Sequence, residues 1–191
     1  MRIGILGGTF NPIHIGHLIL AEEAGWKLKL DKVIFVPAYM PPHKKVASDV
    51  SAEDRLSMVR IALEGNPGFE VSAIEIEARK KSYSVDTLKA LKDIHGPDAK
   101  LFFLTGSDSL KDLSSWKDIE DIFRLSKFIV ANRPGYPVEN VPKEAQTMVI
   151  TPIEVSSCGI RRRLGEGRSI RYLVPEKVRE YIAAKKLYLT P

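Results

Sequence analysis

Two histidines three residues apart, His14 and His17, follow a glycine-rich turn near the start of the chain. The turn comes directly after the apolar residues 3–6, which predict a buried strand, and a helical pattern begins at about Ile15. A strand, a glycine turn and a helix N-terminus aim backbone N–H groups and the positive end of a helix dipole at one point, which suits a phosphate group. Histidines at that point can donate hydrogen bonds to oxygen atoms that gain negative charge in a reaction.

A structural interpretation of this turn is also open. Strand–turn–helix units with two glycines are common, and this turn matches neither the dinucleotide-binding GxGxxG pattern nor a Walker loop. A single histidine would more often have a structural role. Two histidines at this spacing, beside Gly7 and Gly8, favour a functional site.

Two other segments carry cations that suit a polyphosphate. Lys44 ends the stiff segment 41–44, and its ammonium is a compact point charge, although Lys45 follows it and the loop also fits a solvated surface. Ser156 and Ser157 precede a helical pattern with an arginine in its first turn. They predict either a second phosphate cradle or an ordinary N-cap.

One acidic and one aromatic residue could recognise a nucleoside. Asp108 could accept hydrogen bonds from ribose hydroxyls or help to hold a metal ion, and Trp116 could stack on an aromatic ring or pack in the core. By contrast, Arg162 and Arg163 point to different helix faces, and we expect both to be solvated.

Apolar runs alternate with amphipathic ones, which predicts an α/β fold with a mostly parallel sheet flanked by helices. Further strands are expected at 33–36, 69–76, 101–104, 128–131 and 147–150. Helices are expected from residue 15, at 52–63 with Ser51 as N-cap, at 84–94, at 110–125 as one helix or two, at 160–164 and at 176–185. Loops that follow strands should converge at the carboxyl edge of the sheet, where ligands bind in such folds.

Composition narrows the class of protein. With 191 residues, the chain can form one domain with a substantial core. The net charge of +5 fits an anionic substrate but is too small to argue for nucleic acid. A single cysteine, Cys158, excludes internal disulfides and suits a reducing compartment, and no apolar run is long enough to span a membrane. We therefore expect a cytoplasmic protein without nucleic-acid or membrane partners, and leave a homo-oligomer open.

Taken together, these segments resemble the nucleotidyltransferases with an HxGH signature, here at 14–17, and within them the bacterial nicotinate-nucleotide adenylyltransferases. The similarity runs almost end to end. It comprises Gly-Gly-Thr-Phe-Asn-Pro at 7–12, Pro-Pro-His-Lys at 41–44, Ser-Tyr-Ser-Val-Asp-Thr-Leu at 82–88, Gly-Ser-Asp-Ser-Leu at 106–110, Asn-Arg-Pro-Gly at 132–135 and Val-Ser-Ser-Cys-Gly-Ile-Arg at 155–161. The resemblance implies a Rossmann-like nucleotidyltransferase fold in a single domain, 1–191, with a small C-terminal helical part from about 155.

The resemblance also implies an activity. AMP would pass from ATP to nicotinate mononucleotide, giving nicotinate adenine dinucleotide and pyrophosphate, without a covalent enzyme intermediate. Catalysis would then consist of positioning and charge stabilisation. Mg²⁺ would travel on the ATP phosphates and need few direct protein ligands.

Residue roles follow from the same resemblance. The catalytic group would comprise His14, His17, Lys44 and Arg161. ATP would be bound by Gly7, Gly8, Thr9, Phe10, Asp108, Arg133, Ser156, Ser157 and Ile160, and the nicotinate nucleotide by Ser84 and Trp116. No protein metal site is expected. The family usually has threonine where this chain has Ser84 and Cys158; we expect backbone N–H groups to make the phosphate contact at the second position.

Other activities remain open at this point. The same transfer could use nicotinamide mononucleotide or phosphopantetheine as acceptor. A non-catalytic nucleotide- or RNA-binding module would explain the basic residues between 161 and 171, but it would not explain the paired histidines.

Overall fold

A computed structural model describes residues 1–42, 50–132 and 141–189 of the chain. Six parallel strands form one sheet in the order β3-β2-β1-β4-β5-β6. The strands are β1 (Arg2–Gly8), β2 (Lys32–Pro37), β3 (Phe69–Val71), β4 (Lys100–Gly106), β5 (Ser126–Ala131) and β6 (Ala145–Met148). The strand order reverses at β1 and β4, which creates a crevice between the loops that follow them.

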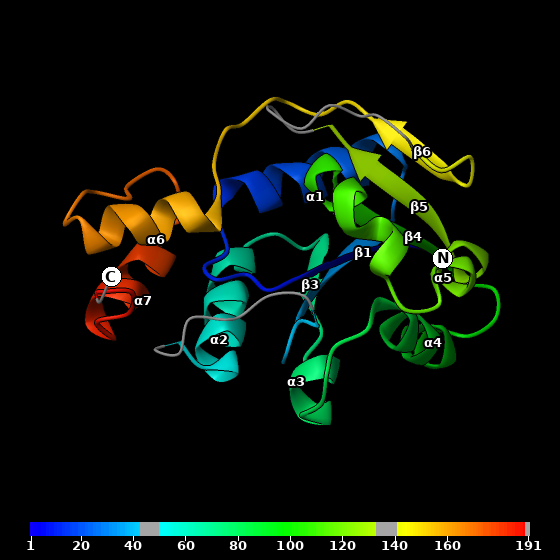
Figure 1. Ribbon diagram of the computed structural model, residues 1–191, viewed down its shortest axis with the longest axis horizontal. Coiled ribbons are helices and arrows are strands. Elements are labelled where there is room, and N and C mark those ends of the chain that lie inside the picture. The colour runs from blue at the N-terminus through cyan, green and yellow to red at the C-terminus, as the bar shows by residue number, and fades with distance from the viewer. Residues whose placement is uncertain (43–49, 133–140, 190–191) are drawn as a thin grey trace.

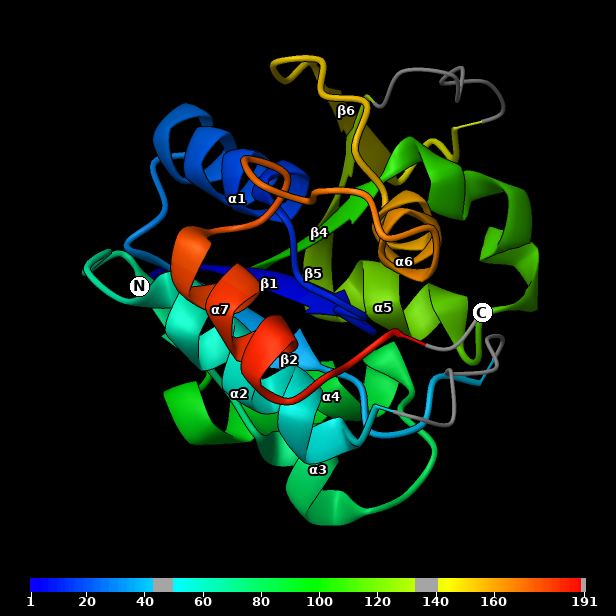
Figure 2. The same ribbon diagram turned by 90° about the vertical axis from the view of Figure 1, so that its left-hand side faces the viewer.

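Helices cover both faces of this sheet (Figures 1 and 2). They are α1 (Ile15–Lys27), α2 (Ala52–Leu63), α3 (Ile74–Ala78), α4 (Ser84–His95), the 3₁₀ helix η1 (Ser107–Ser115), α5 (Ile119–Leu125), α6 (Ser157–Gly165) and α7 (Glu176–Ala184). One core cluster joins the sheet to α1, α2, α6 and α7, and a second joins its other face to α4, η1 and α5. The prediction of a parallel α/β sheet flanked by helices is therefore confirmed.

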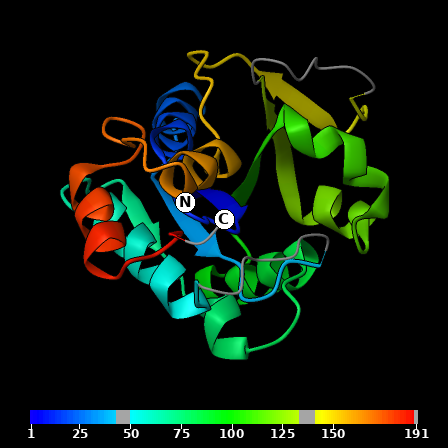
Figure 3. The ribbon, with the colours of Figure 1, turned by 60° about the vertical axis from the view of Figure 1, so that its left-hand side comes forward.

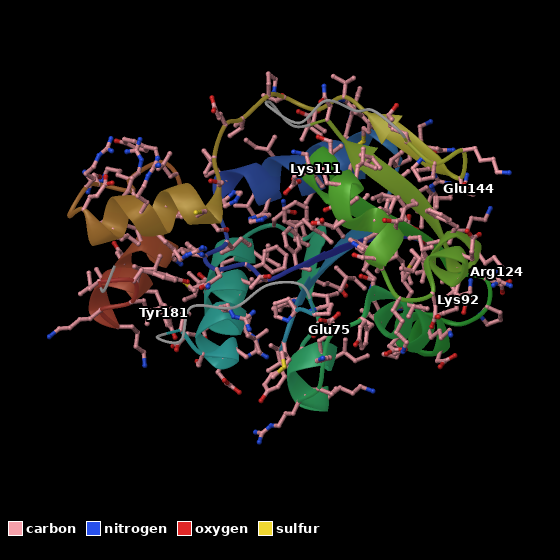
Figure 4. The ribbon with its side chains drawn as sticks, in the orientation of Figure 1. Glu75, Lys92, Lys111, Arg124, Glu144 and Tyr181 are labelled. Atoms are coloured by element: carbon pink, nitrogen blue, oxygen red, sulfur yellow. The ribbon has the colours of Figure 1, made fainter. Side chains whose placement is uncertain are left out.

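The C-terminal helices belong to the first of these clusters. Val178 and Ile182 of α7 pack in it with Met58 and Val59 of α2. The hydroxyl of Tyr181 adds a hydrogen bond to Asp54 Oδ1 at 2.9 Å, and Figure 4 shows this tyrosine between α7 and α2. Figure 3 shows α7 beside α2, with α6 in front of β1.

The sequence patterns predicted the positions of most helices and strands well. The predicted helix 52–63 matches α2, and Ser51 caps it by accepting a hydrogen bond from the Asp54 N–H at 2.9 Å. The segment 110–125 divides into η1 and α5, which is the two-helix alternative. Strand β6 begins earlier than the predicted 147–150.

The prediction of one strand over 69–76 is wrong after Val71. Strand β3 pairs with β2 over three residues only, and the chain then turns into α3. The turn buries Ile76 in the core and brings the Glu75 carboxyl to the hydroxyl of Thr87 on α4. This long-range contact at the edge of the sheet overrides the local alternation of apolar residues.

Within the described part of the chain, no helix has both the length and the apolar character needed to cross a membrane.

Candidate functional site

Two adjoining cavities open at the carboxyl ends of β1 and β4. The first has a volume of about 460 Å³ and the second about 200 Å³. Their shared lining consists of Gly7, Gly8, Thr9, Thr105, Asp108 and Ser109. Molecules bound in the two cavities would therefore meet over the glycine turn, at the point where the strand order reverses.

The two histidines line the first cavity. Their rings are stacked, with centroids 3.7 Å apart and planes at 23°. The backbone N–H of His14 donates to Nδ1 of His17 at 3.2 Å. Because Nδ1 accepts, the proton of a neutral His17 ring resides on Nε2, so this ring is set to donate from that atom.

Gly16, between the histidines, makes room for this arrangement. A Cβ on Gly16 would lie 3.2 Å from both Cε1 and Nδ1 of His14, which is closer than such contacts normally are. The buried side chain of Phe10 supports His17 from another side, through an edge-on contact at 5.0 Å between centroids. The glycine of the HxGH signature thus avoids a tight contact with the His14 ring.

Helix α6 approaches the same turn from the C-terminal part of the chain (Figure 3). Ser156 caps the helix, its Oγ accepting from the Gly159 N–H at 3.1 Å, and the hydroxyl of Ser157 donates to Pro12 O at 2.9 Å. Among the described residues, the N–H groups of Ser157 and Cys158 have no acceptor, and both residues line the first cavity. A helix N-terminus with two available N–H groups is a ready site for a phosphate.

Arg161 joins α6 to the turn. Its Nη1 donates to Asn11 O at 2.7 Å, and the side chain also lines the first cavity. One edge of the guanidinium is therefore anchored by protein, while its other donors can meet an anion in the cavity.

Asp108 stands where the two cavities meet, in the first turn of η1. Its carboxylate folds over the end of β4 so closely that a Cβ on Gly106 would lie 2.5 Å from Oδ1. A larger residue at position 106 would therefore displace this carboxylate from its present place at the cavity wall.

The second cavity contains both residues expected to hold the acceptor. Ser84 is the first residue of α4, and both Ser84 and Trp116 line this cavity. The Trp116 ring also makes edge-on contacts with Phe103 at 5.7 Å and Phe128 at 6.1 Å. Trp116 therefore packs against core residues and also lines the cavity, and its stacking on a substrate ring stays a prediction.

The other residues that the sequence predicts for the ATP site lie in several different places. Gly7, Gly8, Thr9 and Phe10 line the first cavity. Ile160 of α6 is only 1 % exposed. Its side chain packs in the core, so it supports the site by anchoring this helix. Lys44 and Arg133 lie outside the described residues.

Several residues at the site carried no signal in the sequence. Buried Arg55 reaches the glycine turn from α2, and Tyr188, near the C-terminus, donates its hydroxyl proton to Asn11 Oδ1 at 2.6 Å. The second cavity is also lined by Glu75 and Lys117. Each is placed by contacts between distant parts of the chain, which sequence spacing does not show.

A clamp at the surface holds the segment that follows β6, part of which lines the first cavity. The carboxylate of Glu23 on α1 contacts Lys27 at 2.7 Å and accepts from the Thr151 N–H at 2.7 Å. These hydrogen bonds lower the pKa of Glu23 to about 2, and the bond from Lys27 has the largest effect.

Replacing Glu23 by Gln should lower Tm in a pH-dependent way. The folded-state pKa is depressed, so the clamp stabilises the protein above the ordinary pKa of 4.5 and loses this effect as pH falls towards about 2. Partly exposed pairs are worth about 1 kcal/mol or less, so we expect a loss of at most about 4 °C at pH 7. Thermal melts of both proteins at pH 7, 5 and 3 measure it; a difference that grows towards acid would contradict this account.

The chain is similar in sequence to a known family and to several of its members. Residues 5–163 match the cytidylyltransferase-like family. A probable nicotinate-nucleotide adenylyltransferase of Exiguobacterium sibiricum is 47% identical over 192 residues, covering 100% of both chains. Its counterpart in Moorella thermoacetica is 41% identical over 198 residues, covering 98% of this chain and 91% of the relative.

A solved structure shows the same fold. Plasmodium falciparum nicotinic acid mononucleotide adenylyltransferase, complexed with NaAD, superposes with a TM-score of 0.82 at 21% identity. The match covers 98% of this chain and 97% of the other. Since the bacterial relatives match over nearly their full length, the chain belongs to the nicotinate-nucleotide adenylyltransferases, within the cytidylyltransferase-like family.

Proposed function

We propose that the protein transfers AMP from ATP to nicotinate mononucleotide and releases pyrophosphate. The observation that carries this proposal is the pair of cavities that share the glycine turn and Asp108. One cavity has the cationic and N–H groups that suit a triphosphate, and the other has an aromatic wall that suits a pyridine ring. Family membership supports the same substrates.

The reaction needs no enzyme nucleophile. An oxygen of the acceptor 5′-phosphate attacks the α-phosphorus of ATP, a new P–O bond forms, and the bond to the β-phosphate breaks to release pyrophosphate. Because attacking and leaving oxygens must lie in line, most of the catalysis comes from positioning and from stabilising charge.

We assign the histidine pair to the α-phosphate. The Nε2–H of His17 would donate to a non-bridging oxygen as negative charge builds up, and His14 would hold the neighbouring oxygen from its stacked position. Arg161 and the N-terminus of α6 would hold the β- and γ-phosphates. Asp108 would accept from nucleoside hydroxyls at the junction.

We propose that Mg²⁺ enters with ATP. Among the described residues that line the first cavity, Asp108 is the one carboxylate. Mg²⁺ commonly keeps several waters and uses one or two carboxylates together with substrate phosphates, so this donor set fits a metal held mainly by the nucleotide. The ion would neutralise charge on the phosphates during transfer.

A single assay tests the activity and the acceptor. The protein is incubated with ATP, Mg²⁺ and either nicotinate mononucleotide, nicotinamide mononucleotide or phosphopantetheine, and pyrophosphate is measured. Of the three acceptors, we expect only nicotinate mononucleotide to give rapid release of pyrophosphate. No release with any acceptor would refute the enzyme, and equal release with the two pyridine nucleotides would refute the choice of acceptor.

The Cys158→Thr variant tests whether backbone groups carry the phosphate contact at α6. The N–H groups of Ser157 and Cys158 are available whatever the side chain. We therefore expect the KM for ATP to change by less than about twofold, since a hydrogen bond that mattered would be worth about 1 kcal/mol or more. A tenfold fall in KM would show that the missing hydroxyl limits ATP binding.

A further inference from the structure

Arg55 is a buried cation to which the proposed chemistry gives no role. It lies on α2, is only 1 % exposed, and forms no ion pair within the part of the chain that the structure describes. Its Nε has no hydrogen-bond partner there either. Burial of a guanidinium without a carboxylate partner is costly, which suggests that Arg55 has a specific use.

Its guanidinium joins the segments that follow two neighbouring strands. Nη1 donates to Thr9 O at 2.7 Å and to Ala38 O at 2.6 Å, and Nη2 donates to Tyr39 O at 3.0 Å. Thr9 follows β1 in the glycine turn, whereas the other two follow β2. One planar side chain thus fixes the ends of both strands relative to each other.

The polar contacts continue towards the acceptor cavity. The N–H of Tyr39 donates to Ser82 Oγ at 3.0 Å, and the N–H of Ser82 donates to Met40 O at 3.0 Å. Close to Ser82, the Glu75 carboxyl lines the second cavity and accepts a hydrogen bond from the Thr87 hydroxyl on α4. Glu75 belongs to α3, and Figure 4 labels it at that helix.

The two ends of this series of hydrogen bonds lie at the two cavities. Thr9 lines both cavities, whereas Ser82 and Glu75 line the second. Burial raises the pKa of Glu75, and the positive charge of Arg55 opposes that rise only in part. A displacement at either end would change the distance between the glycine turn and the start of α4.

We propose that Arg55, acting through Tyr39 and Ser82, is a positioning residue that sets the separation of the phosphate turn and the acceptor pocket. This inference rests on the proposed function. In-line transfer depends on the distance between the two reacting groups, and an error of about 1 Å can cost about 10²-fold in rate. If the contacts of Arg55 are lost, each cavity still has its own lining residues. Binding of a single substrate should therefore depend on these contacts far less than the rate of transfer does.

Two variants separate positioning from folding. Arg55→Lys keeps the charge but cannot hold three carbonyls, because an ammonium lacks the planar fork of a guanidinium. Ser82→Ala removes one link and leaves all three Arg55 contacts in place. Ser126→Ala is the matched control: Ser126 is buried, its hydroxyl donates to Ile122 O at 2.9 Å, and it lines neither cavity.

The experiment measures kcat and two binding constants on each variant, with a thermal melt to establish the folded fraction. Calorimetry gives Kd for α,β-methylene-ATP with Mg²⁺ and, separately, for nicotinate mononucleotide. For Arg55→Lys we expect kcat per folded molecule to fall about 100-fold, and for Ser82→Ala about 10-fold, with each Kd changing less than about threefold. Ser126→Ala should keep its kcat.

Other outcomes overturn the inference. Unchanged kcat in folded Ser82→Ala and Arg55→Lys would show that the contacts only stabilise the fold. A loss confined to one Kd would make them part of one substrate's binding wall. An inactive wild-type protein would instead refute the proposed function, so the two failures are distinguishable.

Discussion

His17→Ala should lower kcat by about 10²- to 10³-fold while changing the KM for ATP by less than about fivefold. A donor aimed at charge that develops only in the transition state contributes about that much to catalysis and little to ground-state binding. The structure gives His17 this character, because its Nδ1 is occupied by the backbone N–H of His14 and its neutral ring must donate from Nε2. Steady-state pyrophosphate release with saturating nicotinate mononucleotide measures the effect.

Two further variants sharpen this result. His17→Gln carries an amide N–H group near the former position of Nε2, so it should recover part of the lost rate. His95→Ala removes a histidine at the end of α4 that lines neither cavity, and it should keep normal turnover. Normal turnover of His17→Ala, or a loss seen only in KM, would refute the assignment of this ring to the transition state.

The core of the site was predictable because its signals are local. A buried strand, a glycine turn and a capped helix are each specified by neighbouring residues, and together they bring His14 and His17 to one point. The same is true of α2, whose Ser51 cap and apolar pattern fixed its bounds. Local consistency of this kind explains why the α/β architecture followed from the sequence.

The supports of the site were not predictable, because they join residues far apart in the chain. Tyr188 reaches Asn11 across 177 positions, and Arg55 reaches Thr9 across 46. Arg55 also occupies a core position of an otherwise amphipathic helix, where the pattern alone favours a solvated arginine. The departure of α3 from the expected strand also involves a contact beyond its own segment, the hydrogen bond between Glu75 and Thr87 of α4.

Arg161→Lys should lower kcat/KM for ATP by about 100-fold, although it preserves the charge. The guanidinium performs two tasks: Nη1 donates to Asn11 O at 2.7 Å, and the side chain lines the first cavity. A lysine ammonium can anchor to the turn or meet the phosphates, but its geometry does not serve both at once. Loss of a charge-assisted hydrogen bond to phosphate costs about 1.5–3 kcal/mol, which corresponds to roughly 10- to 160-fold.

The neighbouring arginine provides a matched control for this change. Arg162 lies on the same helix, is exposed and lines neither cavity, so Arg162→Lys should keep kcat/KM. A loss of equal size in both variants would mean that the general basicity of α6 attracts ATP, because long-range attraction does not depend on which arginine supplies the charge. Repeating the assays at higher salt separates the two causes: the Arg161 effect should persist because its contact is short and partly buried, whereas long-range attraction is screened.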